Sequence, residues 1–170
     1  MKAKPEADEY ASYYGKYVSL IDDDDIVAVM EEQLDATVAC LRGLSEEQGN
    51  SRYEPGKWSI KELVGHINDA ERIFAYRALC IARGDQTPLP GFEQDDYIAS
   101  ANFDARSLAD LTTEFELIRR SNLAMMKQFS DEAWLRRGTA SENPISVRAL
   151  VYIIAGHEAH HLNILRSRYL

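Results

Sequence analysis

Four long stretches of the chain carry apolar side chains at every third or fourth position, the spacing that places them on one face of an α-helix. Ser59 has the position of an N-cap before the second stretch, and Glu62 three residues later completes a capping box. Gly43 and Gly84 follow the first and second stretches, and Ser146 precedes the fourth. The pattern predicts four helices, over about 25–43, 59–84, 107–129 and 146–170.

The connections between these helices indicate how the helices run. Residues 44–57 form one loop, whereas residues 85–105 form a long connection that contains Pro88, Pro90 and Gly91. A connection of that length allows the second and third helices to run parallel, with the fourth antiparallel to the third. No segment has a convincing strand pattern. The predicted fold class is therefore all-α, a four-helix bundle with one long crossover between helices two and three.

A length of 170 residues suits one domain that buries a hydrophobic core. We expect the whole chain, residues 1–170, to form this single bundle. Residues 1–9 are polar and charged, and we expect them to be loosely ordered. The aromatic-rich stretch Tyr10–Tyr17 could form a short helical turn laid on the bundle.

Composition and charge exclude several classes of function. The net charge of −9 argues against a nucleic-acid partner, because an acidic surface repels phosphates. No apolar run approaches the roughly 20 residues that span a bilayer, and the first residues lack the apolar segment of a signal peptide. Cys40 and Cys80 lie far apart in helical patterns, so we expect free thiols in a reducing cytoplasm. We therefore expect a cytoplasmic protein that binds neither nucleic acid nor membranes.

The chain has four histidines, and their positions give the strongest functional signal. His157 and His161 are four residues apart on the apolar face of the last predicted helix, and His66 lies on the apolar stripe of the second. Neutral imidazole is the commonest protein ligand for zinc, nickel, copper and iron, and a three-histidine site leaves positions open for water or substrate. His160 points about 60° away from His157 and could replace His161 as a ligand. A metal-free cluster of buried polar side chains is the alternative interpretation.

Residues 157–161 also match the H-E-x-x-H pattern of zinc proteases, in which Glu158 would be the general base. A protease would need a third ligand after the motif, but only nine residues follow it and residue 167 is a serine. The third ligand must lie upstream, and His66 is the remaining histidine. The motif therefore supports a metal site and argues against a protease, and an ion pair is the simpler role for Glu158.

Several segments resemble the DinB-like (damage-inducible) superfamily. Residues 55–66, Pro-Gly-Lys-Trp-Ser-Ile-Lys-Glu-Leu-Val-Gly-His, are similar to the opening of that family's second helix. Residues 156–165, Gly-His-Glu-Ala-His-His-Leu-Asn-Ile-Leu, resemble its last helix. Residues 82–85 and 88–92 match a common subgroup, and the resemblance extends over about 25–170.

The resemblance implies a four-helix bundle that holds a divalent metal through one histidine of the second helix and two of the fourth. In this chain those residues are His66, His157 and His161. The metal would be zinc or nickel, with iron as a further option. Members of the wider family include S-transferases that use bacillithiol or mycothiol and a related maleylpyruvate isomerase, so a low-molecular-weight thiol is a candidate co-substrate.

Two carboxylates near His66 could accept a hydrogen bond from the ring nitrogen that does not bind the metal. Glu62 lies one turn before His66 and Asp69 about one turn after it. Ligating histidines usually donate their second ring N–H to a carboxylate or carbonyl. The capping box is an equally good role for Glu62.

Arg77 lies three turns beyond His66 on nearly the same stripe. There it could bind an anionic substrate. We favour an ion pair with an acidic residue of the crossover, such as Glu93, Asp95 or Asp96.

The leading hypothesis is a thiol-dependent S-transferase acting on small electrophiles in detoxification or stress. A metal-dependent hydrolase is the second hypothesis, and a metal-stabilised stress or binding module without turnover is the third. The sequence names no protein nucleophile beside the histidines. A small-molecule substrate and a homodimer are the partners we expect.

Overall fold

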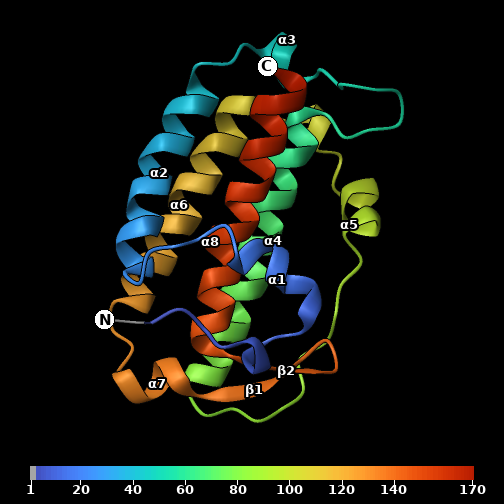
Figure 1. Cartoon of the computed structure of the whole chain (residues 1–170). Helices are drawn as coiled ribbons and strands as arrows, with labels where there is room; N and C mark the ends of the chain where they lie inside the picture. Colours follow the sequence, from blue (N-terminus) through green and yellow to red (C-terminus); the bar gives the residue numbers. More distant parts are fainter. Residues whose placement is uncertain (1–2) are drawn as a thin grey trace.

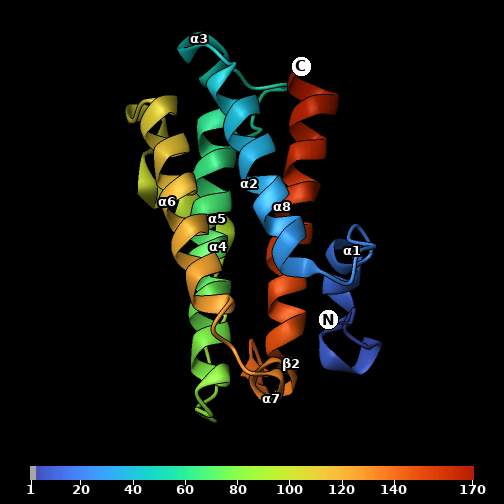
Figure 2. The same ribbon diagram turned by 90° about the vertical axis from the view of Figure 1, so that its left-hand side faces the viewer.

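The computed structural model describes residues 3–170 and shows four long helices packed side by side (Figure 1; Figure 2). Each helix packs against two neighbours in the ring order α2–α6–α4–α8. Helices α4 and α6 run parallel, and α2 and α8 run in the opposite direction (Figure 1). The predicted crossover topology is therefore confirmed. The four helices are α2 (Ile26–Arg42), α4 (Ile60–Ala82), α6 (Leu108–Met126) and α8 (Val147–Ile164).

Short polar side chains begin all four helices. The side chain of Asp25 accepts a hydrogen bond from the backbone N–H of Ala28, and Ser107 and Ser146 cap α6 and α8 in the same way. Before α4, Ser59 and Glu62 form the predicted capping box. These caps satisfy N–H groups that have no partner within the helix, so the sequence sets where each helix starts.

The hydrophobic core is one continuous cluster between the four helices. Helix α8 is its most buried element, because almost every residue between 147 and 158 is inaccessible to solvent. A helix that is apolar all round must be covered all round. Helices α2 and α4 cover two sides of α8, and the N-terminal segment and α7 (Asp131–Leu135) cover more of it.

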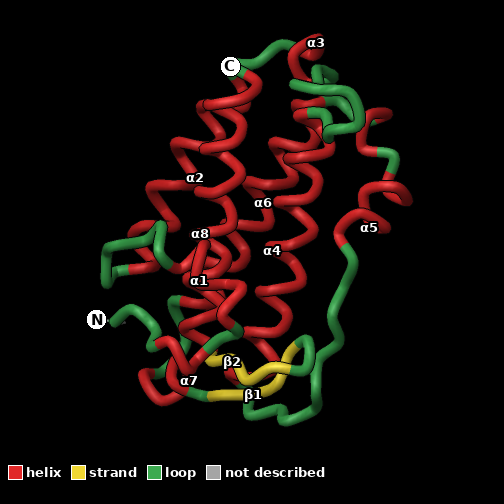
Figure 3. Tube along the Cα trace, turned by 45° about the vertical axis from the view of Figure 1, so that its right-hand side comes forward, coloured by secondary structure: helices red, strands yellow, loops and turns green. Residues whose placement is uncertain are grey.

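A two-stranded hairpin closes one end of the bundle, although the sequence predicted no strand (Figure 3). Strands β1 (Arg137–Ala140) and β2 (Asn143–Ser146) pair antiparallel. Their turn places Ser141 and Glu142 at positive φ, a conformation that Asn-Gly pairs usually signal. The crossover joins this hairpin through Leu89, whose N–H donates to Thr139.

The predicted loops contain three short helical elements. The first connection forms α3 (Glu46–Gly49), and the long crossover forms α5 (Gln94–Ala101) and a 3-10 turn (Phe103–Ala105). After α8 the chain ends in a π-helical turn (Leu165–Tyr169). Helix α5 stands outside the bundle, beside α4 (Figure 1).

The N-terminal segment is held against the bundle more firmly than its polar composition suggests. Two 3-10 turns (Ala7–Glu9 and Ser12–Tyr14) lead into α1 (Gly15–Val18), which packs on α8. This finding matches the helical turn expected within Tyr10–Tyr17. Residues 1–9 were expected to be loosely ordered, but Glu9 is buried, and residues 1–2 lie outside the described part.

Glu9 anchors this segment through a buried ion pair. Its carboxylate accepts hydrogen bonds from Ser146 Oγ at 2.6 Å and from Arg148 Nε at 2.8 Å. Burial alone would raise the pKa of Glu9, but the bonds from Arg148 and Ser146 outweigh it and lower the pKa from 4.5 to about 2. The ionised carboxylate therefore stabilises the folded protein.

We expect Glu9→Gln to lower the free energy of unfolding at pH 7 by roughly 2–3 kcal/mol, because the depressed pKa measures stability held by the ionised form. That contribution is present above pH 4.5 and is lost as the pH falls towards 2. Urea unfolding of both proteins between pH 7 and pH 3 should therefore show a difference that shrinks with acid. Glu32→Gln, at an exposed position of α2, is the control. An equal loss in both variants would contradict the anchoring role.

Among the described residues, none of the helices combines the length and apolar character needed to cross a membrane. Cys40 and Cys80 are free and half-buried.

Candidate metal centre

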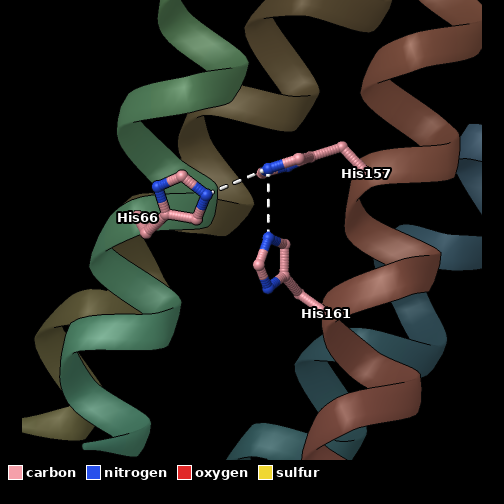
Figure 4. Close-up of side chains that lie close together, drawn as sticks. All are labelled: His66, His157 and His161. Atoms are coloured by element: carbon pink, nitrogen blue, oxygen red, sulfur yellow. Dashed lines mark hydrogen bonds between the residues drawn. The ribbon is translucent and has the colours of Figure 1, made fainter. Parts of the chain in front are cut away.

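Three histidines converge in the middle of the bundle, between α4 and α8 (Figure 4). His66 comes from α4, and His157 and His161 come from successive turns of α8. The Nε2 atom of His157 lies 3.0 Å from Nε2 of His66 and 3.1 Å from Nε2 of His161. The three ligand atoms lie within 4.8 Å of one another, and this is the only such group found among the described residues. The structure therefore brings together the three residues named from the sequence.

Burial keeps these imidazoles neutral. All three side chains are buried. Burial lowers the pKa of His66 to about 4. Burial, together with the neighbouring His66, His160 and Lys16, lowers the pKa of His161 to about 2, and burial also lowers that of His157 well below its usual value. Neutral imidazole is the form that donates a lone pair to a metal ion.

Hydrogen bonding alone does not satisfy this arrangement. A ring nitrogen carries either one hydrogen or one in-plane lone pair, so Nε2 of His157 can form a hydrogen bond with only one of its two neighbours. In addition, Nδ1 of His161 is buried and has no partner. A cation that accepts a lone pair from each Nε2 would satisfy all three nitrogens at once. Nitrogen ligands about 2.0–2.1 Å from a tetrahedral zinc ion stand roughly 3.3–3.4 Å apart, which is close to the 3.0 and 3.1 Å of the two pairs that include His157, so the donor set fits a metal.

Aromatic rings surround the triad. Trp58 packs against His66 with ring centroids 4.9 Å apart and lies 6.5 Å from His161. On the other side, the ring of Tyr17 lies 5.2 Å from that of His157. These rings restrict water around the imidazoles.

Gly156, next to His157, allows the N-terminal segment to lie directly on α8. A Cβ atom at this position would lie 2.1 Å from the carbonyl oxygen of Tyr17, which is a severe steric clash. The contact is with backbone atoms, which cannot rotate away. The Tyr17 ring therefore reaches His157 because residue 156 has no side chain.

Glu158 of the H-E-x-x-H pattern faces away from the triad and belongs to a buried ion-pair network. It accepts hydrogen bonds from Thr37 Oγ1 at 2.5 Å and from Arg119 Nη2 at 2.5 Å. Arg119 also forms a bidentate pair with Glu71 at 2.8 and 2.9 Å, and Asn122 donates to Glu71. Burial raises the pKa of Glu158, although Arg119 and Thr37 oppose the shift. The ion pair that we favoured for Glu158 is therefore observed, and its carboxylate is held by Arg119 and Thr37.

Sequence reasoning missed this network, although a signal was present. Arg119 lies four residues from both Phe115 and Leu123, on the apolar stripe of α6. A charged residue on such a stripe is buried with partners. Each of the four long helices contributes a side chain to the network, so it joins the whole bundle behind the histidines.

The two carboxylates expected behind His66 are engaged elsewhere. Glu62 accepts from the backbone N–H of Ser59 at 2.7 Å and pairs with Arg52, so it serves the capping box. Asp69 is half-buried and lies 3.7 Å from Arg72. No contact joins either carboxylate to His66 among the described residues.

Arg77 does not form the ion pair that we favoured. Its Nη2 donates to the carbonyl of Pro90 at 2.6 Å and to Ser141 Oγ at 3.2 Å. Its guanidinium carbon lies 5.6 Å from the centroid of the Phe74 ring and 5.9 Å from that of Phe92. The crossover folds its backbone towards Arg77, so a carbonyl and a hydroxyl meet the guanidinium instead of a carboxylate. Arg77 thus ties the crossover to the hairpin.

His160 is half-buried and lies outside the convergent group. Its ring packs against Tyr17, with centroids 5.3 Å apart, and against His161 at 5.1 Å. The structure therefore gives His160 a packing contact beside the triad, and the ligand atoms that converge are those of the other three histidines.

Two cavities flank the triad. One of about 290 Å³ includes His161, Trp58, Leu63 and Tyr169 in its wall. The other, of about 320 Å³, is bordered by His157 and by aromatic and polar side chains: Tyr13, Tyr14, Tyr17, Phe74, Phe92, Glu93 and Gln94. Asp95 of α5 lines both cavities. Both volumes suit a small molecule rather than a protein chain.

A four-helix bundle with a convergent histidine triad between two of its helices defines a class of metal-site proteins. Residues 30–165 match the model of the DinB superfamily, and the chain belongs to that family. The family resemblance noted from the sequence is thereby confirmed.

Sequence relatives agree with this membership. A protein of Oceanobacillus iheyensis, provisionally named a metal-dependent hydrolase, is 27% identical over 126 residues, which cover 72% of this chain and 70% of that protein. A protein of Geobacillus thermodenitrificans with the same provisional name is 33% identical over 82 residues, 48% of this chain and 45% of the relative.

Solved structures agree on the fold. YfiT from Bacillus subtilis, a four-helix bundle of unusual topology for which metal-dependent hydrolysis has been suggested, superposes with a TM-score of 0.73 at 14% identity. The match covers 97% of this chain and 93% of YfiT. The DinB-like protein YjoA of the same species matches with a TM-score of 0.61 at 21% identity, over 85% of this chain and 88% of YjoA.

Proposed function

We propose that this protein is a metal-dependent hydrolase of small molecules, with a divalent metal held by His66, His157 and His161. The observation that carries the proposal is the convergence of three buried Nε2 atoms that cannot all be satisfied by hydrogen bonds. The provisional names of the two sequence relatives support the choice of hydrolysis.

A zinc, nickel or iron ion bound there would supply Lewis acidity, which favours the deprotonated form of a water or thiol and polarises a substrate carbonyl or phosphoryl group. The protein side chains perform the remaining tasks. The neutral imidazoles present their lone pairs without first losing a proton. Trp58 and Tyr17 pack around the triad and restrict water. The two flanking cavities receive the substrate and hold it beside the triad, which contributes by proximity.

Thiol-dependent S-transfer is the second candidate, and the position of Glu158 favours it. Because Glu158 is bound to Arg119 and Thr37, the H-E-x-x-H motif supplies no general base. A thiol is acidic enough to need less help than water in losing its proton. The bundle walls would then hold thiol and electrophile together.

The test uses full-length protein purified without a histidine tag and loaded in turn with zinc, nickel and iron(II). We expect one equivalent of metal and metal-dependent hydrolysis of p-nitrophenyl acetate or bis(p-nitrophenyl) phosphate, at least about tenfold above the metal-free protein. Conjugation of 1-chloro-2,4-dinitrobenzene with bacillithiol, mycothiol or glutathione would favour the transferase instead. His66→Ala is the negative control. Bound metal without turnover in any assay would refute an enzyme and favour the metal-stabilised module.

A further inference from the structure

The first turn of α5 places a carboxylate in the walls of both cavities that flank the histidine triad. Asp95 lines the cavity that reaches His157 and also the cavity that reaches His161, so it lies where the two cavities approach each other. The side chain is exposed, and no hydrogen bond or ion pair holds it within the described residues. Over residues 3–170, this carboxylate therefore has no polar partner.

Asp95 is the one carboxylate of the described part of the chain that borders both cavities. Of the two flanking cavities, Glu93 lines only that of His157. Glu158, the base that the sequence motif offers, is buried against Arg119 on the far side of α8. Hydrolysis of an ester or phosphate gains from a positioned base that accepts a proton from the attacking water. The site therefore lacks an identified general base, and Asp95 is the unpaired carboxylate that borders both cavities.

We propose that Asp95 is the acid–base residue of this site, an inference that rests on the proposed hydrolase function. As the water oxygen bonds to the acyl carbon of an ester, the Asp95 carboxylate accepts the proton that this oxygen loses. When the bond between the acyl carbon and the alcohol oxygen breaks, the alcohol leaves with that proton. The products are one acid and one alcohol, and Asp95 returns to its ionised form.

If Asp95 served only to stabilise α5, its substitution should have the same effect as that of its neighbour Asp96. Asp95 and Asp96 are both in the first turn of α5, where carboxylates favour the positive end of the helix dipole. Asp96 lines neither of the two flanking cavities. The two residues have the same charge and the same helical turn, so Asp96→Asn is a matched control for Asp95→Asn.

The test measures azide binding to the cobalt(II)-loaded full-length protein by its visible absorption, which needs no turnover. Asp95→Asn removes a negative charge beside the position where azide would bind, so we expect azide to bind roughly three- to tenfold more tightly than to the parent. Asp96→Asn should stay within about twofold of the parent. With p-nitrophenyl acetate, kcat of Asp95→Asn should fall at least about a hundredfold, with KM nearly unchanged.

The outcomes separate the two proposals. Equal azide affinities in the parent and both variants would overturn the role of Asp95 and leave the metal site standing. The same small change in both variants would assign Asp95 to helix stability alone. A parent protein that gives no cobalt spectrum would refute the proposed metal-dependent function, and the role of Asp95 with it.

Discussion

His157→Ala should weaken metal binding by more than about a hundredfold. The apparent binding energy of a structural zinc ion, about 10–16 kcal/mol, is shared among its ligands, so losing one costs roughly 3 kcal/mol. His157 should be the most sensitive position, because its Nε2 contacts those of both other histidines. Competition with a chromogenic chelator would measure the affinity.

His160→Ala is the matched control for this experiment. It removes an imidazole three residues away on the same helix, from a half-buried position outside the convergent group. We expect the variant to keep its metal and an affinity within a few-fold of the parent. Equal losses in the two variants would show that the triad is not the ligand set, and an unchanged affinity in His157→Ala would show the same.

Arg119→Met should be the most destabilising substitution in the bundle core. Arg119 is fully buried and donates hydrogen bonds to the carboxylates of both Glu71 and Glu158. Removing one partner of a buried ion pair typically costs about 3–5 kcal/mol, because it leaves charge buried without compensation. Urea unfolding at pH 7 would measure the loss. Burial already raises the pKa of Glu158, so protonation at lower pH should reduce the deficit.

The neighbouring residue provides the control. Arg120 pairs with Glu116 on the exposed face of α6, and such surface pairs contribute at most about 1 kcal/mol. Arg120→Met should therefore change the unfolding free energy much less. If both variants lost the same small amount, the network would not hold the helices together. A triple variant with Glu71→Gln and Glu158→Gln should recover part of the Arg119→Met loss, because it removes the stranded charges.

The long helices and the triad could be predicted because their signals are local and repeated. A period of about 3.6 residues persists through several turns in each long helix, and the pair His157 and His161 falls on the apolar face by that same period. The same helical period places His66 on the apolar face of α4. The parallel course of α4 and α6 follows from the length of the crossover alone.

The missed features depend on contacts between distant residues. The hairpin has no Asn-Gly turn, and Ser141 and Glu142 take positive φ because the strands around them pair. Helix α5 is too short to show a helical period, so the sequence did not predict that Asp95 lines both cavities. The partners of Arg77 were missed because a backbone carbonyl carries no sequence signal.

Gly156, the residue before His157, determines whether the N-terminal segment can cover the triad. Because a side chain at Gly156 would collide with the backbone of Tyr17, a relative with any larger residue there cannot seat its N-terminal segment in the same place. Such a relative would expose the imidazole that Tyr17 covers here. The identity of this single position should therefore separate related proteins whose N-terminal segment covers the histidine triad from those in which the triad is open on that side.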